Sequence, residues 1–363
     1  MPEKTQANNK MKNKIALIIS STLVLFLCYR ESTSAYPPIN LKQQLQECQG
    51  RYKILYETYR VSNFEIFIMN PDGSNQQNLT NTPDIQEFYP QASPDGTKIC
   101  FMAYQGQGQN RIRCLYLMNP DGTGRKKIVD NGRWPCWSPD GRTIAFVRDY
   151  LPRFNIKDYA TQGLYFYDLQ SQQITEHPNC KNIQHIYCLS WHPNGRWIAA
   201  TVHGGLGQDH AIITLARDDN RIYKLLGGNR CRPVFSPEGD QVAWCDLDWA
   251  VGVANLRLYN GKLNAVAPHQ LAPSEDHEGI FVYHPDWSPD GKLIAFCRGP
   301  VGPDHPVDNQ SPGTGTYHHA AIGVKADGWD IYVVSSRGGS WLQLTTDGHS
   351  NKEPNWIKVV NSP

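Results

Sequence analysis

The sequence has 363 residues, with 35 basic and 34 acidic side chains and a formal net charge of +1. This even balance excludes the strongly basic face of a dedicated nucleic-acid-binding protein, so we expect no nucleic-acid partner. A hydrophobic content of 40% excludes a disordered chain, while 30 glycines, 25 prolines and a charged fraction of only 19% favour strands and tight turns over helices.

The first 35 residues are predicted to be a signal peptide. Lys10, Lys12 and Lys14 precede an apolar stretch over residues 15–28, and small residues follow up to Ala35. Such a stretch rises about 21 Å as a helix, short of the roughly 30 Å hydrocarbon core of a bilayer. We therefore predict cleavage near Ala35, a periplasmic or secreted protein, and no transmembrane anchor after cleavage. The alternative is an uncleaved anchor.

A short helical segment is expected next, over residues 36–52. The exported chain would keep nine cysteines, an odd number, so at least one thiol stays outside intrachain disulfides. Cys100 and Cys114 flank one predicted hairpin, and Cys180 and Cys188 share one connection. Each pair forms a disulfide or consists of buried thiols, and the sequence leaves this open.

The rest of the chain is built from one repeat. A Ser-Pro-Asp-Gly turn or a close variant recurs at intervals of roughly 50 residues, each time followed by an apolar strand. Proline presets the first turn position and glycine takes the left-handed one. The five turns follow Ala92, Trp137, Trp191, Phe235 and Trp287.

The strand before each turn carries a proline in all repeats but one, where Leu189 replaces it. Since proline lacks an N–H, this strand must lie at a sheet edge, which suits the inner strand of a propeller blade. Half-repeats at residues 53–56 and 353–356 fit together as one further blade. The prediction is an all-β, six-bladed propeller of four-stranded blades over residues 53–358, closed by N- and C-terminal half-blades, with a tail at 359–363.

These repeats resemble the WD40-like repeats of the TolB propeller family, as in Trp-Ser-Pro-Asp-Gly at residues 137–141 and Asn-Pro-Asp-Gly at 119–122. The resemblance implies a propeller that contacts protein partners of an envelope-spanning Tol–Pal complex. The segment before the first strand has room for one short helix and not for the α/β domain that precedes the TolB propeller. Oligogalacturonate lyases, built from similar repeats, imply a metal and catalytic histidines instead.

Function is expected on the face that carries the long connections, called here the top face. The residue before each inner-strand proline should surround the channel mouth there, and this inner ring suits a polar ligand or the extended tail of a partner. The alternative is that Tyr89 and Trp134 fill the channel by packing. The inner ring comprises Tyr89, Trp134, Cys188, Arg232, His284 and Glu353, with Arg133, Tyr187 and Tyr283 one step further out.

Ten of the 12 histidines fall on predicted top-face loops, although polar residues favour loops in any case. The leading prediction is a non-enzymatic binding or scaffold module for a protein or glycan, with no catalytic residue assigned and no cofactor required. The alternative is a metal-assisted carbohydrate-active enzyme, a polysaccharide lyase, whose divalent metal is held by His277, His284, His318 and His319. The ten histidines are His177, His185, His203, His210, His277, His284, His305, His318, His319 and His349.

Overall fold

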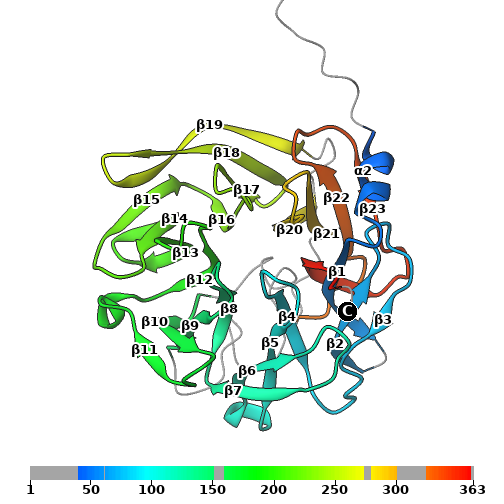
Figure 1. Ribbon diagram of the computed structural model, residues 1–363, viewed down its shortest axis with the longest axis horizontal. Helices are drawn as coiled ribbons and strands as arrows, with labels where there is room; N and C mark the ends of the chain where they lie inside the picture. Colours follow the sequence, from blue (N-terminus) through cyan, green and yellow to red (C-terminus); the bar gives the residue numbers. More distant parts are fainter. Residues whose placement is uncertain (1–39, 61, 151–158, 274–278, 301–323, 361–363) are drawn as a thin grey trace, which may run out of the picture. The chain divides into compact units, whose positions relative to one another are not determined.

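A computed structural model describes residues 40–60, 62–150, 159–273, 279–300 and 324–360, and from Leu41 onward the chain forms one compact unit. Six four-stranded antiparallel sheets surround a central axis as the blades of a propeller (Figure 1). The predicted fold class is confirmed. Among the described residues, none of the helices has the length and apolar character needed to cross a membrane.

The blades repeat one strand order from the axis outward. The inner strands are β4 (Glu87–Ala92), β8 (Arg133–Trp137), β12 (Ile186–Trp191), β16 (Arg230–Phe235), β20 (Ile280–Trp287) and β24 (Ser350–Lys358). The second strands are β5 (Ile99–Gln105), β9 (Thr143–Asp149), β13 (Trp197–Gly205), β17 (Gln241–Asp246), β21 (Leu293–Pro300) and β1 (Tyr52–Arg60).

The two outer positions of each blade follow the same sequence order. The third strands are β6 (Ile112–Met118), β10 (Thr161–Asp168), β14 (Gln208–Ala216), β18 (Ala250–Tyr259), β22 (Asp330–Ser335) and β2 (Asn63–Met69). The outer strands are β7 (Lys126–Asp130), β11 (Ile174–Glu176), β15 (Ile222–Gly227), β19 (Lys262–Pro273), β23 (Trp341–Gln343) and β3 (Gln77–Asn78). The described helices are α2 (Leu41–Cys48), η1 (Gly108–Asn110) and η2 (Cys180–Asn182).

The repeated turn holds each inner strand to the second strand. In the first example, the Ser93 hydroxyl accepts a hydrogen bond from the Lys98 N–H at 2.9 Å, and the Gly96 N–H donates to the Ser93 carbonyl at 2.9 Å. Gly96 has a φ of 76°, and a Cβ there would lie 2.4 Å from the Lys358 carbonyl oxygen. The turn therefore requires glycine both for its conformation and for the close approach of β24.

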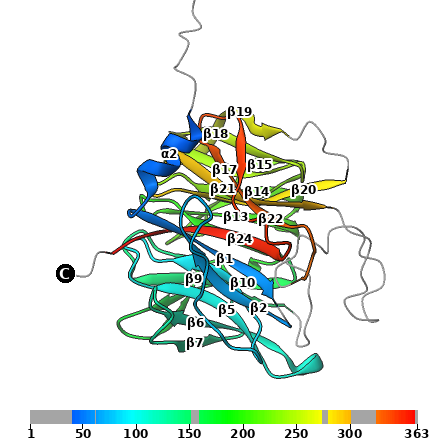
Figure 2. The same cartoon turned by 90° about the vertical axis from the view of Figure 1, so that its right-hand side faces the viewer.

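The ring is closed by its two ends. Strand β24 pairs with β1 from Tyr52 opposite Lys358 to Tyr59 opposite Ser350, and Figure 2 shows the two strands side by side. Because β1, β2 and β3 complete that sheet, the closing blade combines both half-repeats, as predicted. Closure gives β1 a partner on each side, β24 and β2, so no second strand of the ring has an unpaired edge.

Strand register separates the cysteines of the first predicted hairpin. Cys100 lies opposite Leu117, and Cys114 lies opposite Ala103, so their side chains do not meet across the strands. The nine cysteines of the described chain are all buried free thiols. Burial raises the pKa of the Cys114 thiol to about 11, so it behaves as a small apolar group.

Candidate functional site

Every residue of the inner ring has left-handed backbone geometry. Their φ angles lie between 51° and 57°. Pairing with the second strand shifts register at the same point in all six blades, which marks a β-bulge. Two of the displaced N–H groups donate to side chains of the preceding blade: Tyr89 N–H donates to Glu57 at 3.2 Å, and Arg232 N–H donates to Thr201 Oγ1 at 2.7 Å.

The inner ring lies inside the channel and fills it. Its members are between 0% and 7% exposed, so they are not an open mouth as the sequence suggested. Tyr89 contacts Trp134 at 4.9 Å between ring centroids and also reaches His284 at 6.3 Å, two blades away. Contacts between blades that are not neighbours mean that side chains meet across the axis.

Polar side chains of the inner ring contact one another and their neighbours within this packing. His284 Nδ1 contacts the Glu353 carboxylate, in the neighbouring blade. The Arg232 guanidinium stacks on Tyr283 at 4.7 Å, and its Nη1 donates to Cys188 Sγ at 3.2 Å. The repeat logic that placed His284 beside Glu353 is therefore reflected in the structure, although both side chains support packing as well.

A pocket of about 350 Å³ lies on the axis at the opposite face, between the Ser-Pro-Asp-Gly turns. All inner-ring residues except Trp134 line its floor. A second tier lines the wall two residues further along each inner strand, and the rim follows three residues later. The second tier is Gln91, Cys136, Ser190, Val234, Asp286 and Asn355, and the rim is Pro94, Pro139, Pro193, Pro237, Pro289 and Lys358.

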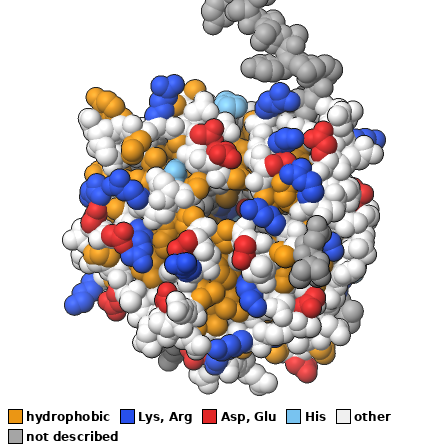
Figure 3. Space-filling view, viewed as in Figure 1, with side chains coloured by type: hydrophobic (Ala, Val, Ile, Leu, Met, Phe, Trp, Pro, Cys, Tyr) orange, Lys and Arg blue, Asp and Glu red, His pale blue; other side chains and the backbone are white. Residues whose placement is uncertain are grey.

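Figure 3 views this Ser-Pro face and shows the hollow at its centre, bordered mainly by hydrophobic side chains. Below that border the wall is polar because second-tier side chains join adjacent blades. Ser190 Oγ accepts from the Phe235 N–H at 3.0 Å, Asp286 Oδ2 from the Trp356 N–H at 2.7 Å, and Asn355 Oδ1 from the Ala92 N–H at 2.8 Å. We call this cavity the axial pocket.

The sequence analysis singled out none of the second-tier residues, and Asp286 is the one with a titratable carboxyl group. Burial in the pocket wall raises the pKa of its carboxyl group to about 7, and the Trp356 N–H only partly offsets that effect. Strand alternation supplied a signal, since residues two apart on a strand share a face. His284 and Asp286 are two apart on β20, and both line the axial pocket despite the bulge at His284.

The raised pKa of Asp286 predicts a pH-dependent stability. Between the ordinary value of 3.8 and about 7, the folded protein holds a proton that the unfolded chain has released. That stabilisation is present below pH ~4 and is lost as the pH rises through about 7. Asp286→Asn is expected to reduce the loss of stability between pH 5 and 8, by up to a few kcal/mol in unfolding free energy. The melting temperature of the variant should therefore fall less than that of wild type over this range.

Asparagine is a conservative control at this position, because Asn355 makes the same interblade hydrogen bond in the next blade. Melting curves of both proteins across that pH range provide the measurement. Parallel pH dependence of wild type and variant would show that Asp286 is ionised throughout.

The other predicted site residues lie above the inner ring. Arg133 is 2% exposed and pairs with Asp149 at 3.0 Å. The Tyr187 hydroxyl lies 3.3 Å from His210 Nε2, and burial lowers the pKa of His210. His203 lies opposite His210 on β14, with its ring stacked on Tyr159 at 4.3 Å. The structure thus gathers three of the predicted top-face histidines among aromatic side chains, because the His185 ring also lies 6.3 Å from that of Tyr159.

Among the described histidines, His177 lies apart from that group. His177 is 2% exposed and its Nε2 lies 2.7 Å from the Ala216 carbonyl oxygen, which is a structural contact. Of the predicted metal ligands, His277, His318 and His319 lie outside the described residues, as does His305. Within the described part of the chain, the one group of three metal-binding side chains that converge is Cys231, Cys245 and Asp248.

Comparisons with known proteins agree with this architecture. The WD domain, G-beta repeat family (WD40) matches residues 172–212. The chain is 25% identical over 279 residues to dipeptidyl-peptidase 5 of Porphyromonas gingivalis, covering 64% of this chain and 40% of that protein. The TolB structure from Acinetobacter baumannii has a TM-score of 0.59 at 18% identity, over 84% of this chain and 66% of that one.

Hydrazine synthase of Kuenenia stuttgartiensis superposes with a TM-score of 0.58 at 13% identity, over 91% of this chain and 50% of that one. The match to this chain spans only part of each relative, 40% of the length of the peptidase and 66% of the TolB chain. These features define a six-bladed β-propeller with WD40-like repeats. Its fold is TolB-like, as the repeat pattern predicted.

Proposed function

We propose that this protein is a non-enzymatic binding module whose axial pocket receives an extended segment of a partner protein. The pocket carries the proposal: it has a volume of about 350 Å³, and the packed inner ring forms its floor. Ligand-binding cavities in proteins commonly have volumes of about 300–1,000 Å³. The TolB-like fold supports a binding role.

The tiers of the pocket suit an extended peptide. The rim lies five positions along the chain from the inner ring, which corresponds to roughly 15 Å for extended backbone. Prolines at the rim, such as Pro289, and tryptophans of the pocket lining, such as Trp287, offer apolar contact to side chains of the entering segment. Gln91, Asp286 and Asn355 on the wall offer hydrogen bonds to its peptide groups.

The expected ligand site therefore differs from the top face considered first. The long top-face connections include residues 151–158, 274–278 and 301–323, which are outside the described residues. A top-face site and a glycan partner stay as predictions.

The test is a selection of linear peptides from a random phage-displayed library on the full chain. We expect selected peptides to bind wild type and to lose at least tenfold in affinity with Gln91→Trp, which fills the pocket. Gln77→Trp is the matched control, since Gln77 is exposed on the outer strand β3. Unchanged far-ultraviolet circular dichroism would confirm that both variants fold.

Two results would contradict the proposal. Peptides that bind Gln91→Trp as well as wild type would place recognition outside the axial pocket. A glycan array whose hits depend on Gln91, with no pocket-dependent peptide, would identify a carbohydrate ligand instead.

Export is the second component of the proposal, and it rests on the lysine-flanked apolar stretch of residues 15–28. Expression in a bacterial host with an envelope should give a mature chain that begins at or near Tyr36. Amino-terminal sequencing of the periplasmic and secreted fractions measures this directly. A chain that keeps Met1 and stays with membranes after an alkaline wash would show an uncleaved anchor.

A further inference from the structure

One register position is equivalent in all six blades. The residue before each inner-ring residue lies opposite a residue of the second strand. Only the blade built on β16 and β17 places a thiol opposite a thiol here. The six pairs are Phe88–Met102, Arg133–Val147, Tyr187–Thr201, Cys231–Cys245, Tyr283–Cys297 and Lys352–Glu57.

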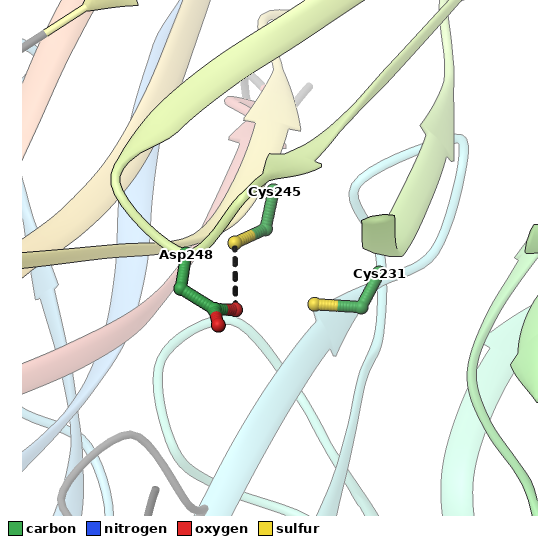
Figure 4. A group of neighbouring side chains, drawn as sticks. All are labelled: Cys231, Cys245 and Asp248. Atoms are coloured by element: carbon green, nitrogen blue, oxygen red, sulfur yellow. Dashed lines mark hydrogen bonds between the residues drawn. The ribbon is translucent and has the colours of Figure 1, made fainter. Parts of the chain in front are cut away.

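A carboxylate completes this group. The sulfur atoms of Cys231 and Cys245 and an oxygen of Asp248 all lie within 4.8 Å of one another, and Figure 4 shows the three side chains directed toward a common point. Cys245 Sγ lies 3.9 Å from Asp248 Oδ1. Cys231 is 3% exposed and Cys245 is 0% exposed, while Asp248 is half-buried, so the carboxylate lies on the solvent side.

The backbone and a neighbouring blade hold Asp248 in place. Leu247 and Asp248 have φ angles of 55° and 67°, so the loop from β17 to β18 turns twice through the left-handed region. The Tyr283 hydroxyl donates a 2.7 Å hydrogen bond to Asp248 Oδ1. Such an outer hydrogen bond orients a carboxylate in the way that second-layer groups orient metal ligands.

We propose that Cys231, Cys245 and Asp248 form a binding site for a thiophilic divalent cation of the zinc class, independent of peptide binding at the axial pocket. Zinc binds cysteine sulfur at about 2.3 Å and carboxylate oxygen at about 2.0–2.2 Å, usually with four ligands. Donors within 4.8 Å of one another need only a small contraction to reach tetrahedral spacing. A water molecule would supply the fourth ligand from the side of Asp248.

The charge balance is consistent with this assignment. Binding one divalent cation releases one proton from each thiol, and with the ionised carboxylate the site carries a net charge of −1. The Arg232 guanidinium stacks on Tyr283, the residue that holds Asp248, and supplies a positive charge beside the site.

The experiment uses the full chain, reduced with a phosphine, stripped with a chelator and titrated with Co²⁺ under anaerobic conditions. We expect a saturable thiolate-to-cobalt charge-transfer band at one metal per chain, which Zn²⁺ abolishes by displacement. Cys231→Ser should remove the band. Cys297→Ser is the matched control, because Cys297 occupies the Cys245 position of the next blade but lies opposite Tyr283.

Asp248→Asn keeps the proposal testable should the serine variant fail to fold. It retains both thiolates, so the band should persist while Co²⁺ affinity falls at least tenfold. No charge-transfer band in folded, reduced wild type would overturn the proposal, as would equal loss of the band in Cys297→Ser. Alkylation under denaturing, non-reducing conditions that spares both Cys231 and Cys245 would identify a disulfide there instead, and would also overturn it.

Discussion

Removal of residues 350–363 is expected to abolish cooperative unfolding of the propeller. This deletion takes away β24, the inner strand of the closing blade, which pairs with β1 over its length. The edge of β1 would be unpaired, and the first and last blades would lose the strand between them. The truncated chain should aggregate or elute as a swollen species in size-exclusion chromatography, without a sharp melting transition.

A point substitution separates strand loss from side-chain loss. Trp356 on β24 is 4% exposed and lies edge-on to Tyr52 at 6.4 Å, so Trp356→Ala removes buried packing and keeps the strand. We expect that variant to lose about 3–5 kcal/mol and still unfold cooperatively. A truncated chain that stays monomeric with an unchanged melting temperature would show that the ring does not depend on closure.

The blades could be predicted because the turns and the inner-strand prolines are local signals that recur. Ser93 shows why: its hydroxyl and carbonyl both form hydrogen bonds within its own turn, so the same residues produce the same turn at each recurrence. The two half-repeats each lack part of a four-stranded blade, and together they make one complete blade. No long-range information was needed for the number of blades.

The conformation of the inner ring could not be predicted from the same prolines. Proline disfavours the helical region for the residue before it, but says nothing of a left-handed φ. Cys188 has a φ of 51° although Leu189 follows it, so the bulge is imposed by the packing of blades around the axis and not by proline. Burial of Arg232 under aromatic rings depends on the same packing.

The thiol cluster was missed for a related reason. Whether Cys231 faces Cys245 depends on cross-strand register, and the bulge in β16 shifts that register between Cys231 and Val234. Counting residues outward from the turn at Ser236 therefore misplaces the pair. Asp286 was within reach, because it lies between the bulge and the turn at Ser288, in the register that the turn sets.

Lys352→Met is expected to destabilise the protein by about 3–5 kcal/mol. Lys352 and Glu57 are both 0% exposed, with Nζ and Oε1 3.7 Å apart, and Lys352 Nζ also donates to the Val324 carbonyl at 2.8 Å. The variant keeps the volume of the side chain but removes its cation. The Glu57 carboxylate then stays buried, and it cannot turn away because it accepts the Tyr89 N–H.

Adding Glu57→Gln tests that explanation. Glutamine keeps an acceptor for the Tyr89 N–H and removes the buried negative charge, so the double variant should recover part of the stability that Lys352→Met loses. Lys292→Met, which breaks the exposed 3.1 Å pair with Glu47, is the control and should change the chemical-denaturation midpoint little. Strictly additive effects of the two buried substitutions would mean that Lys352 acts through packing and its backbone hydrogen bond rather than through the charge of Glu57.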